Sequence, residues 1–106
     1  MFVNEDERRK LIEWIENEPF CTSKVVIAKS RQAIGNHYHK HKNEKFLLLT
    51  GKAFHVVLGD EERENVEAPV MFDVPKGMFH VFELEPGSIL LGVADKPHDP
   101  DDEIRR

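Results

Sequence analysis

The sequence predicts an all-β domain, a small barrel or sandwich, and three observations favour it. From Phe20 onward, short segments rich in valine, isoleucine, leucine and phenylalanine recur along the chain. Turn-forming pairs that contain glycine or proline separate these segments. No stretch carries a long helical period. About eight or nine short strands around one core are therefore expected.

The N-terminal part allows two interpretations. Asn4 and Glu7 have the spacing of a helix N-cap and its reciprocal carboxylate, so a short helix could follow them. Residues 10–15 also alternate as a short β-strand does, and periodicity does not decide between the two. Pro19 disfavours helix at the residue before it, so a turn is expected ahead of Phe20.

The remaining strands follow from the apolar segments and from the turns between them. Gly51-Lys52 forms a tight turn, so the strands on either side of it are expected to run antiparallel. The expected strands are residues 24–29, 46–50, 53–58, 63–67, 70–74, 79–84 and 88–94. All 106 residues are expected to form a single domain, with residues 1–9 as an N-terminal arm and residues 95–106 as an irregular, charged C-terminal tail.

The amino-acid composition limits the classes of partner that this chain is expected to bind. Fifteen basic and twenty acidic side chains give a formal net charge of −5, which offers no electrostatic support for a nucleic-acid partner. The single cysteine, Cys21, excludes an internal disulfide framework. No apolar stretch approaches the roughly 20 residues of a membrane-spanning helix, and no apolar run follows a basic start. We therefore expect no membrane partner and a cytoplasmic location.

The densest group of chemically active side chains lies between Gly35 and Gly51. It contains His37, His39 and His41 at alternate positions, and alternate side chains of a strand point to the same face. Imidazole nitrogens together with a carboxylate oxygen are a ligand set that suits zinc, iron, nickel, copper or manganese. The segment therefore predicts a metal site.

Strand alternation separates the expected metal ligands of this group from His41. His39 and Glu44 are five positions apart, so an unbroken strand would place them on opposite faces, and residues 40–43 must include a turn or bulge. His41 falls inside that turn and is interpreted as a rim residue. A further ligand is expected from another strand, and His80 is the candidate because a proline-glycine turn leads directly to it.

Two motifs resemble the signature motifs of the cupin superfamily. The first motif, His-x-His-x4-Glu-x6-Gly, is met by His37, His39, Glu44 and Gly51. The second motif, Pro-x-Gly-x-x-His, is met by Pro75, Gly77 and His80. Leu84 occupies a position where cupins commonly have asparagine. The resemblance implies a cupin-type β-barrel (a double-stranded β-helix or jelly roll), and it suggests a homodimer. It also implies one divalent transition metal (Zn, Fe, Ni, Mn or Cu), bound through His37, His39, Glu44 and His80.

A narrower resemblance concerns the cupins of sugar-nucleotide metabolism. Residues 35–39 and 43–47 are similar to the C-terminal cupin of capsular polysaccharide synthesis enzymes. Residues 6–11 resemble the Asp-x-Arg-Gly-x-Leu-like opening strand of that group, with Arg9 in place of the glycine, and this favours a strand over residues 10–15. The resemblance implies an epimerase or isomerase that acts on a small oxygenated metabolite, such as a nucleotide-linked keto-sugar.

In this interpretation the metal is a Lewis acid on a carbonyl or enediolate oxygen while a base removes a proton from the neighbouring carbon. His55 is a candidate base if its side chain points into the barrel, because an imidazole accepts protons near neutral pH. Tyr38 and His41 are further candidates. Strand alternation directs Tyr38 away from the histidines on either side of it.

Three alternatives stay open at this point. In the first, the enzyme works without a metal, His37 and His39 transfer protons, and Glu44 orients one of them. In the second, the metal organises a sensing or storage module for small molecules that performs no catalysis. The third alternative is a metal-dependent dioxygenase, since three histidines and one glutamate can hold iron with open positions.

Overall fold

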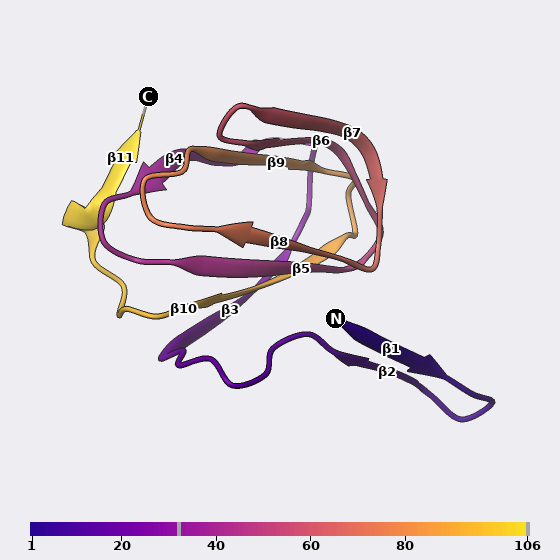
Figure 1. Ribbon diagram of the computed structural model, residues 1–106. Helices are drawn as coiled ribbons and strands as arrows, with labels where there is room; N and C mark the ends of the chain where they lie inside the picture. The colour runs from indigo at the N-terminus through magenta and orange to yellow at the C-terminus, as the bar shows by residue number, and fades with distance from the viewer. Residues whose placement is uncertain (32, 106) are drawn as a thin grey trace.

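The structure is a computed structural model that describes residues 1–31 and 33–105, and strands dominate it (Figure 1). Within the described residues, no helical segment has the length and apolarity that a membrane crossing requires. The strands are β1 (Phe2–Glu5), β2 (Lys10–Glu13), β3 (Thr22–Ile27), β4 (Ala33–His39), β5 (Glu44–Thr50), β6 (Lys52–Leu58), β7 (Glu61–Glu67), β8 (Val70–Val74), β9 (His80–Leu84), β10 (Ile89–Ala94) and β11 (Glu103–Arg105). A single 3-10 turn, η1 (Pro100–Asp102), precedes β11.

Two antiparallel sheets form the body of the fold and face each other across the core (Figure 1). The first sheet has the strand order β3-β10-β5-β8, and the second has the order β11-β4-β9-β6-β7. From β3 onward, strands that follow one another in the chain, such as β4 and β5, lie in different sheets, except for β6 and β7, which pair within one sheet. This arrangement is the jelly roll of the cupin fold, as predicted.

Apolar side chains from both sheets fill the space between them. Phe46 and Leu48 of β5 and Phe82 and Leu84 of β9 are each at most 3% exposed, because alternate residues of a half-buried strand face the core. The Phe46 and Phe82 ring centroids lie 5.1 Å apart, and Phe82 lies 5.4 Å from Phe72. Phe46 also lies 5.8 Å from the ring of His80, so this aromatic cluster packs directly against a predicted ligand.

The link between β5 and β6 is as short as predicted, but the two strands pair with different neighbours. Gly51 is the corner at which the chain leaves one sheet for the other, and its φ of +89° is a conformation that favours glycine. A Cβ atom on Gly51 would lie 2.1 Å from Ser88 Oγ. That hydroxyl accepts a hydrogen bond from the Lys52 amide at 3.0 Å and donates one to the Lys52 carbonyl at 3.2 Å.

The two ends of the chain resolve one ambiguity and correct one prediction. Residues 10–13 form a strand that pairs with β1, so the strand interpretation of the N-terminal part is confirmed and the helix interpretation is wrong. The prediction of an irregular tail over residues 95–106 is wrong for its last part. There β11 pairs antiparallel with β4, in a register that places Glu103 opposite His39 and Arg105 opposite His37.

Candidate metal and catalytic site

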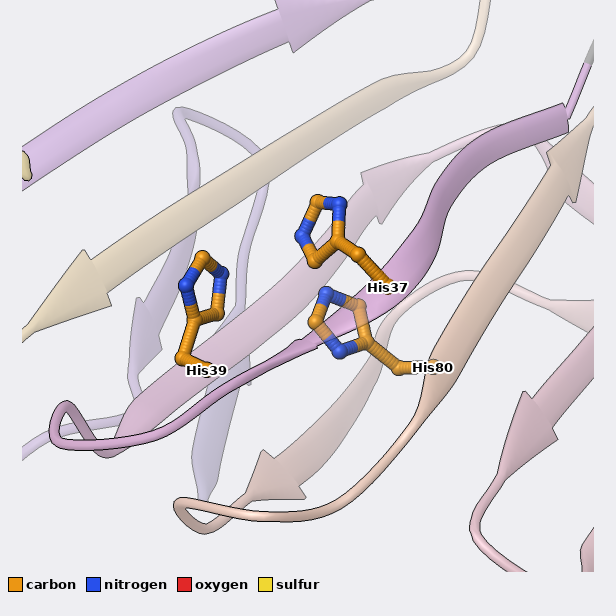
Figure 2. A group of neighbouring side chains, drawn as sticks. All are labelled: His37, His39 and His80. Carbon is orange, nitrogen blue, oxygen red and sulfur yellow. The ribbon is translucent and has the colours of Figure 1, made fainter. Parts of the chain in front are cut away.

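Three histidines converge from two neighbouring strands. His37 and His39 lie on β4, His80 begins β9, and the two strands pair with His37 opposite His80. Their nearest ring nitrogens all lie within 4.8 Å of one another, and the three rings point toward a common space (Figure 2). The His37 ring centroid is 4.7 Å from that of His39 and 4.6 Å from that of His80.

A local irregularity of β4 brings His37 close to His80. The register between β4 and β9 shifts between Gly35 and His37, and both Gly35 and Asn36 have positive φ angles of 94° and 64°. Such a bulge redirects the side chains that follow it. A Cβ atom on Gly35 would lie 2.8 Å from the His80 carbonyl oxygen, so the absence of a side chain allows the two backbones to approach at this point.

Glu44 joins the histidines from the opposite sheet. It begins β5, after residues 40–43 complete the turn that alternation required. Its Oε1 lies 3.1 Å from His39 Nε2 and 4.0 Å from His80 Nε2, while its Oε2 lies 3.5 Å from Lys24 Nζ. The side chain of Glu44 is 1% exposed, so its charge interacts with these groups away from bulk water.

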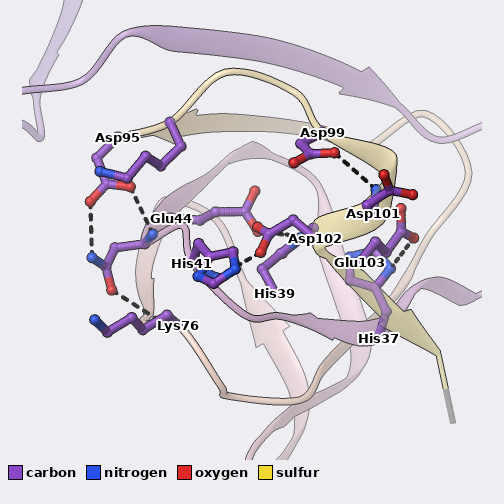
Figure 3. Close-up of polar contacts among 12 residues, drawn as sticks. His37, His39, His41, Glu44, Lys76, Asp95, Asp99, Asp101, Asp102 and Glu103 are labelled. Atoms are coloured by element: carbon purple, nitrogen blue, oxygen red, sulfur yellow. Dashed lines mark hydrogen bonds and ion pairs between the residues drawn. The ribbon is translucent and has the colours of Figure 1, made fainter.

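Asn43 fixes the turn that delivers Glu44, through hydrogen bonds with Asp95 and Lys76, which Figure 3 labels. Its backbone amide and its side-chain amide each donate to the carboxylate of Asp95 at 2.9 Å. Its side-chain oxygen accepts a hydrogen bond from the Lys76 amide, also at 2.9 Å. The amide of Gly77 donates to the His39 carbonyl at 2.7 Å. The two motif segments are therefore tied together by hydrogen bonds outside the strands.

Two acidic residues of the C-terminal segment lie behind the histidines (Figure 3). Glu103 Oε1 is 2.8 Å from His37 Nδ1 and 2.7 Å from Arg105 Nη2. Asp102 Oδ2 is 3.8 Å from His39 Nδ1, and its Oδ1 accepts a hydrogen bond from the His41 amide at 2.7 Å. Sequence analysis missed both residues, because only the pairing of β11 with β4 brings a charged tail to this position.

Several buried polar atoms at this site lack a hydrogen bond. They are His37 Nδ1, both ring nitrogens of His39, and Glu44 Oε1. His37 Nδ1 is close to Glu103, but the contact does not have hydrogen-bond geometry. Each unsatisfied buried group costs about 1–3 kcal/mol. Imidazole nitrogens and a carboxylate oxygen are the donor types that divalent transition metals bind, and unpaired atoms such as His39 Nε2 and Glu44 Oε1 fit the metal that the cupin fold implies.

Burial favours the neutral form of all three imidazoles. Burial lowers the pKa of His80 to about 4, and the neighbouring His37 contributes in the same direction. Burial also lowers the pKa of His37 and of His39, although Glu103 and Glu44, respectively, oppose the shift. A neutral imidazole has a free lone pair, which can bind a metal or accept a proton.

The structure does not bring the other candidate residues to this cluster. The register of β6 with β9 shifts between Ala53 and His55, so that Ala53 and Val56 are buried in the core. His55 instead lies on the outer face, where its Nε2 is 3.9 Å from Glu62 Oε2. Tyr38 lies between the two β4 ligand candidates, and alternation directs its side chain to the opposite face. His41 is exposed in the turn, at the predicted rim.

Comparison with known proteins identifies the family. The model of the polysaccharide biosynthesis C-terminal domain matches residues 4–83, which include all four predicted ligands. The chain belongs to this family. The match ends before Asp102 and Glu103, so the carboxylates behind the histidines lie outside the matched region. A comparison with curated protein sequences found no significant match.

Solved structures with a similar fold include sugar-nucleotide enzymes. A 3,4-ketoisomerase from Helicobacter canadensis has a TM-score of 0.84 at 18% identity, over 99% of this chain and 86% of that chain. The TDP-quinovose 3,4-ketoisomerase WlaRB from Campylobacter jejuni has a TM-score of 0.84 at 19% identity, over 99% and 88% of the two chains. These similarities confirm the cupin fold of this chain.

The capsular polysaccharide assembling protein CapF from Staphylococcus aureus is also similar. It is 28% identical, with a TM-score of 0.68 over 98% of this chain. This chain spans only 33% of CapF. The similarity therefore concerns one part of that larger protein.

Proposed function

We propose that this protein is an epimerase or isomerase that moves a proton at a carbon next to the keto group of a nucleotide-linked sugar. The observation that carries the proposal is the convergence of three imidazoles, two of them buried and one half-buried, with one buried carboxylate inside a cupin of the polysaccharide biosynthesis family. The 3,4-ketoisomerases of the same fold support it. A carbon acid next to a carbonyl loses its proton when a base is positioned beside it and the developing oxyanion is stabilised.

In the leading version, His37, His39, Glu44 and His80 hold one divalent metal. The metal, when bound, would supply a Lewis acid for the carbonyl oxygen. Glu44 is suited to bind the metal because Lys24 contacts one of its carboxylate oxygens while the other oxygen faces His39 and His80. The apolar surroundings of Phe46 and Phe82 exclude water from the inner side of the cluster.

A second version transfers protons without a metal, and the contact between Glu103 and His37 favours it. A carboxylate 2.8 Å from Nδ1 stabilises the imidazolium that forms when Nε2 accepts a proton. His39, with Asp102 behind it and Glu44 in front, could return a proton to the other face or to oxygen. In this version Glu44 orients His39.

One experiment separates these versions. Metal content of the purified protein and deuterium incorporation from D₂O into nucleotide-linked keto-sugars would be measured for the wild type and for His39→Ala, Glu44→Ala and His80→Ala. His41→Ala is the matched control, because His41 is an exposed histidine two residues beyond His39. The leading version expects one metal per chain and exchange in the wild type and the control, with both lost in the three variants.

The remaining outcomes each favour a different reading. Exchange in a metal-free wild type supports proton transfer by His37 and His39. Bound metal without exchange on any keto-sugar supports the sensing or storage module, or the dioxygenase, and contradicts the proposed activity. Full metal content in all three variants contradicts the four-ligand site.

A further inference from the structure

A cavity of about 300 Å³ opens next to the histidine cluster, on the side of β3 and β10. Its walls include Lys24, Lys42, His98 and Glu44. Glu44 therefore belongs both to this cavity and to the candidate metal site. Whatever occupies the cavity lies beside the groups that are proposed to move protons.

Lys42 is the buried lysine of the described residues, only 8% exposed, and it lines this cavity. It makes no hydrogen bond and no ion pair with any described residue, although its positive charge is close enough to lower the pKa of His39. The Lys42 ammonium nitrogen is not among the fully buried atoms that lack a partner, so it reaches the water of the cavity. An anion that enters the cavity can therefore pair with this ammonium group without displacing a partner within the described residues.

Lys24 adds a second ammonium group to the same cavity. Its stem crosses Gly92 of β10, where a Cβ atom would lie 3.0 Å from Lys24 Cε and 2.9 Å from the ring of Phe46. The missing side chain on β10 thus leaves room for Lys24 to reach Glu44, 3.5 Å away. Two ammonium groups face one carboxylate here, so the cavity has an excess of positive charge in a chain whose net charge is −5.

We propose that Lys42, assisted by Lys24, forms an anion site that binds the diphosphate of the nucleotide-linked substrate. This inference rests on the proposed function, since it names the part of that substrate which the cavity holds. Ammonium groups bind phosphate oxygens as point charges with several donors. The diphosphate is attached to the sugar ring, so its site must adjoin the proton-transfer groups, and the shared wall at Glu44 meets this requirement.

Inorganic pyrophosphate is the direct probe, because it carries the diphosphate without the sugar or the base. Calorimetric titration of the chelator-treated protein excludes binding through a metal. A charge-assisted hydrogen bond contributes about 1.5–3 kcal/mol, so Lys42→Gln should weaken pyrophosphate binding at least about tenfold. Lys42→Arg should retain most of the affinity, and Lys40→Gln, an exposed lysine of the same turn, should leave it unchanged.

Thermal unfolding gives a readout that does not depend on catalysis. Because the Lys42 ammonium group reaches cavity water and has no partner among the described residues, Lys42→Gln should keep a Tm close to that of the wild type when no anion is present. Pyrophosphate should then raise the Tm of the wild type and of Lys40→Gln, but not that of Lys42→Gln. A Tm of Lys42→Gln below the wild-type value without anion would show that Lys42 has a structural partner, and would overturn the inference.

The failure of this inference is distinct from the failure of the proposed function. Equal pyrophosphate affinity in the wild type and Lys42→Gln, or no binding to the wild type, overturns the anion site even when keto-sugar exchange is observed. Binding that depends on Lys42 supports the anion site even when no keto-sugar shows exchange. With an active keto-sugar, Lys42→Gln should raise KM much more than it lowers kcat.

Discussion

Glu103 Oε1 lies 2.8 Å from His37 Nδ1, on a strand that the family match does not cover. A carboxylate beside Nδ1 favours the tautomer that carries its proton there, which leaves the Nε2 lone pair free. Arg105 holds the same carboxylate oxygen at 2.7 Å and donates to the Gly35 carbonyl at 3.0 Å. The last strand therefore places a carboxylate against a side chain of the candidate site.

Replacing Glu103 tests this contact. Glu103→Gln should weaken metal binding by about 10–100-fold, the range found for residues that orient metal ligands. Chelator competition would measure the affinity, and side-chain ¹⁵N NMR of the metal-free protein would report the His37 tautomer. Asp101→Asn is the control, since Asp101 is exposed in the same segment and contacts neither histidine. An unchanged His37 tautomer in Glu103→Gln would contradict the assignment.

The metal-free protein should lose stability as the pH falls from about 6.5 to about 4. The folded protein holds the pKa of His80 near 4, below its ordinary value of 6.5, so the unfolded chain binds the proton more readily in this window. Stability is therefore greatest above pH 6.5, and His80 accounts for a loss on the order of 3 kcal/mol. Urea titrations between pH 4 and pH 7 would measure it.

His80→Gln provides the comparison for the pH series. It removes the titrating group, so its stability should change less across the window than that of the wild type, with the change due to His37 and His39 remaining. Equal pH dependence in the two proteins would show that the His80 pKa is not depressed.

Gly51 should tolerate alanine poorly, and Gly87 offers a matched control. Both have φ near +90°, so alanine costs about 1–2 kcal/mol of backbone strain at either position. At Gly51 the added methyl group also meets Ser88 Oγ, whereas nothing lies within 4 Å at Gly87. Gly51→Ala should therefore be less stable than Gly87→Ala by about 2 kcal/mol or more in urea unfolding. Equal losses of stability in Gly51→Ala and Gly87→Ala would mean that the backbone at Gly51 can shift to accommodate the added methyl group.

The homodimer expected from the cupin resemblance stays a prediction, and the structure indicates where to test it. β3 is an edge strand whose Val25 and Ile27 are more than 60% exposed, and the β1–β2 hairpin pairs with no other strand of the described residues. Exposed apolar edges favour association. Light scattering should give a dimer mass for the wild type and a monomer mass for a Val25→Lys, Ile27→Lys double variant. A monomeric wild type at high concentration would contradict the prediction.

The histidines and Glu44 could be predicted because their grouping depends on local properties. Alternation places His37 and His39 on one face, and the turn between His39 and Glu44 follows from their odd spacing. The position of His55 could not be predicted in this way. The register shift before it turns its side chain outward, and such a shift arises from pairing with β9.

Long-range pairing of strands also explains the other differences between the predictions and the structure. The short Gly51-Lys52 link indicates a reversal of direction but does not indicate that β5 and β6 enter different sheets. Glu103 lies in a charged segment without an apolar face, so no sequence pattern marks it as a strand. Its role depends on the register of β11 with β4.

The candidate site draws its histidines from one sheet and Glu44 from the other. An ion bound by all four side chains would therefore link the two sheets. Part of its binding free energy would oppose their separation, so metal loading should slow hydrogen exchange along both β5 and β9, including amides far from the ligands. In that case, metal occupancy of the site would determine how strongly both sheets of the jelly roll resist local opening.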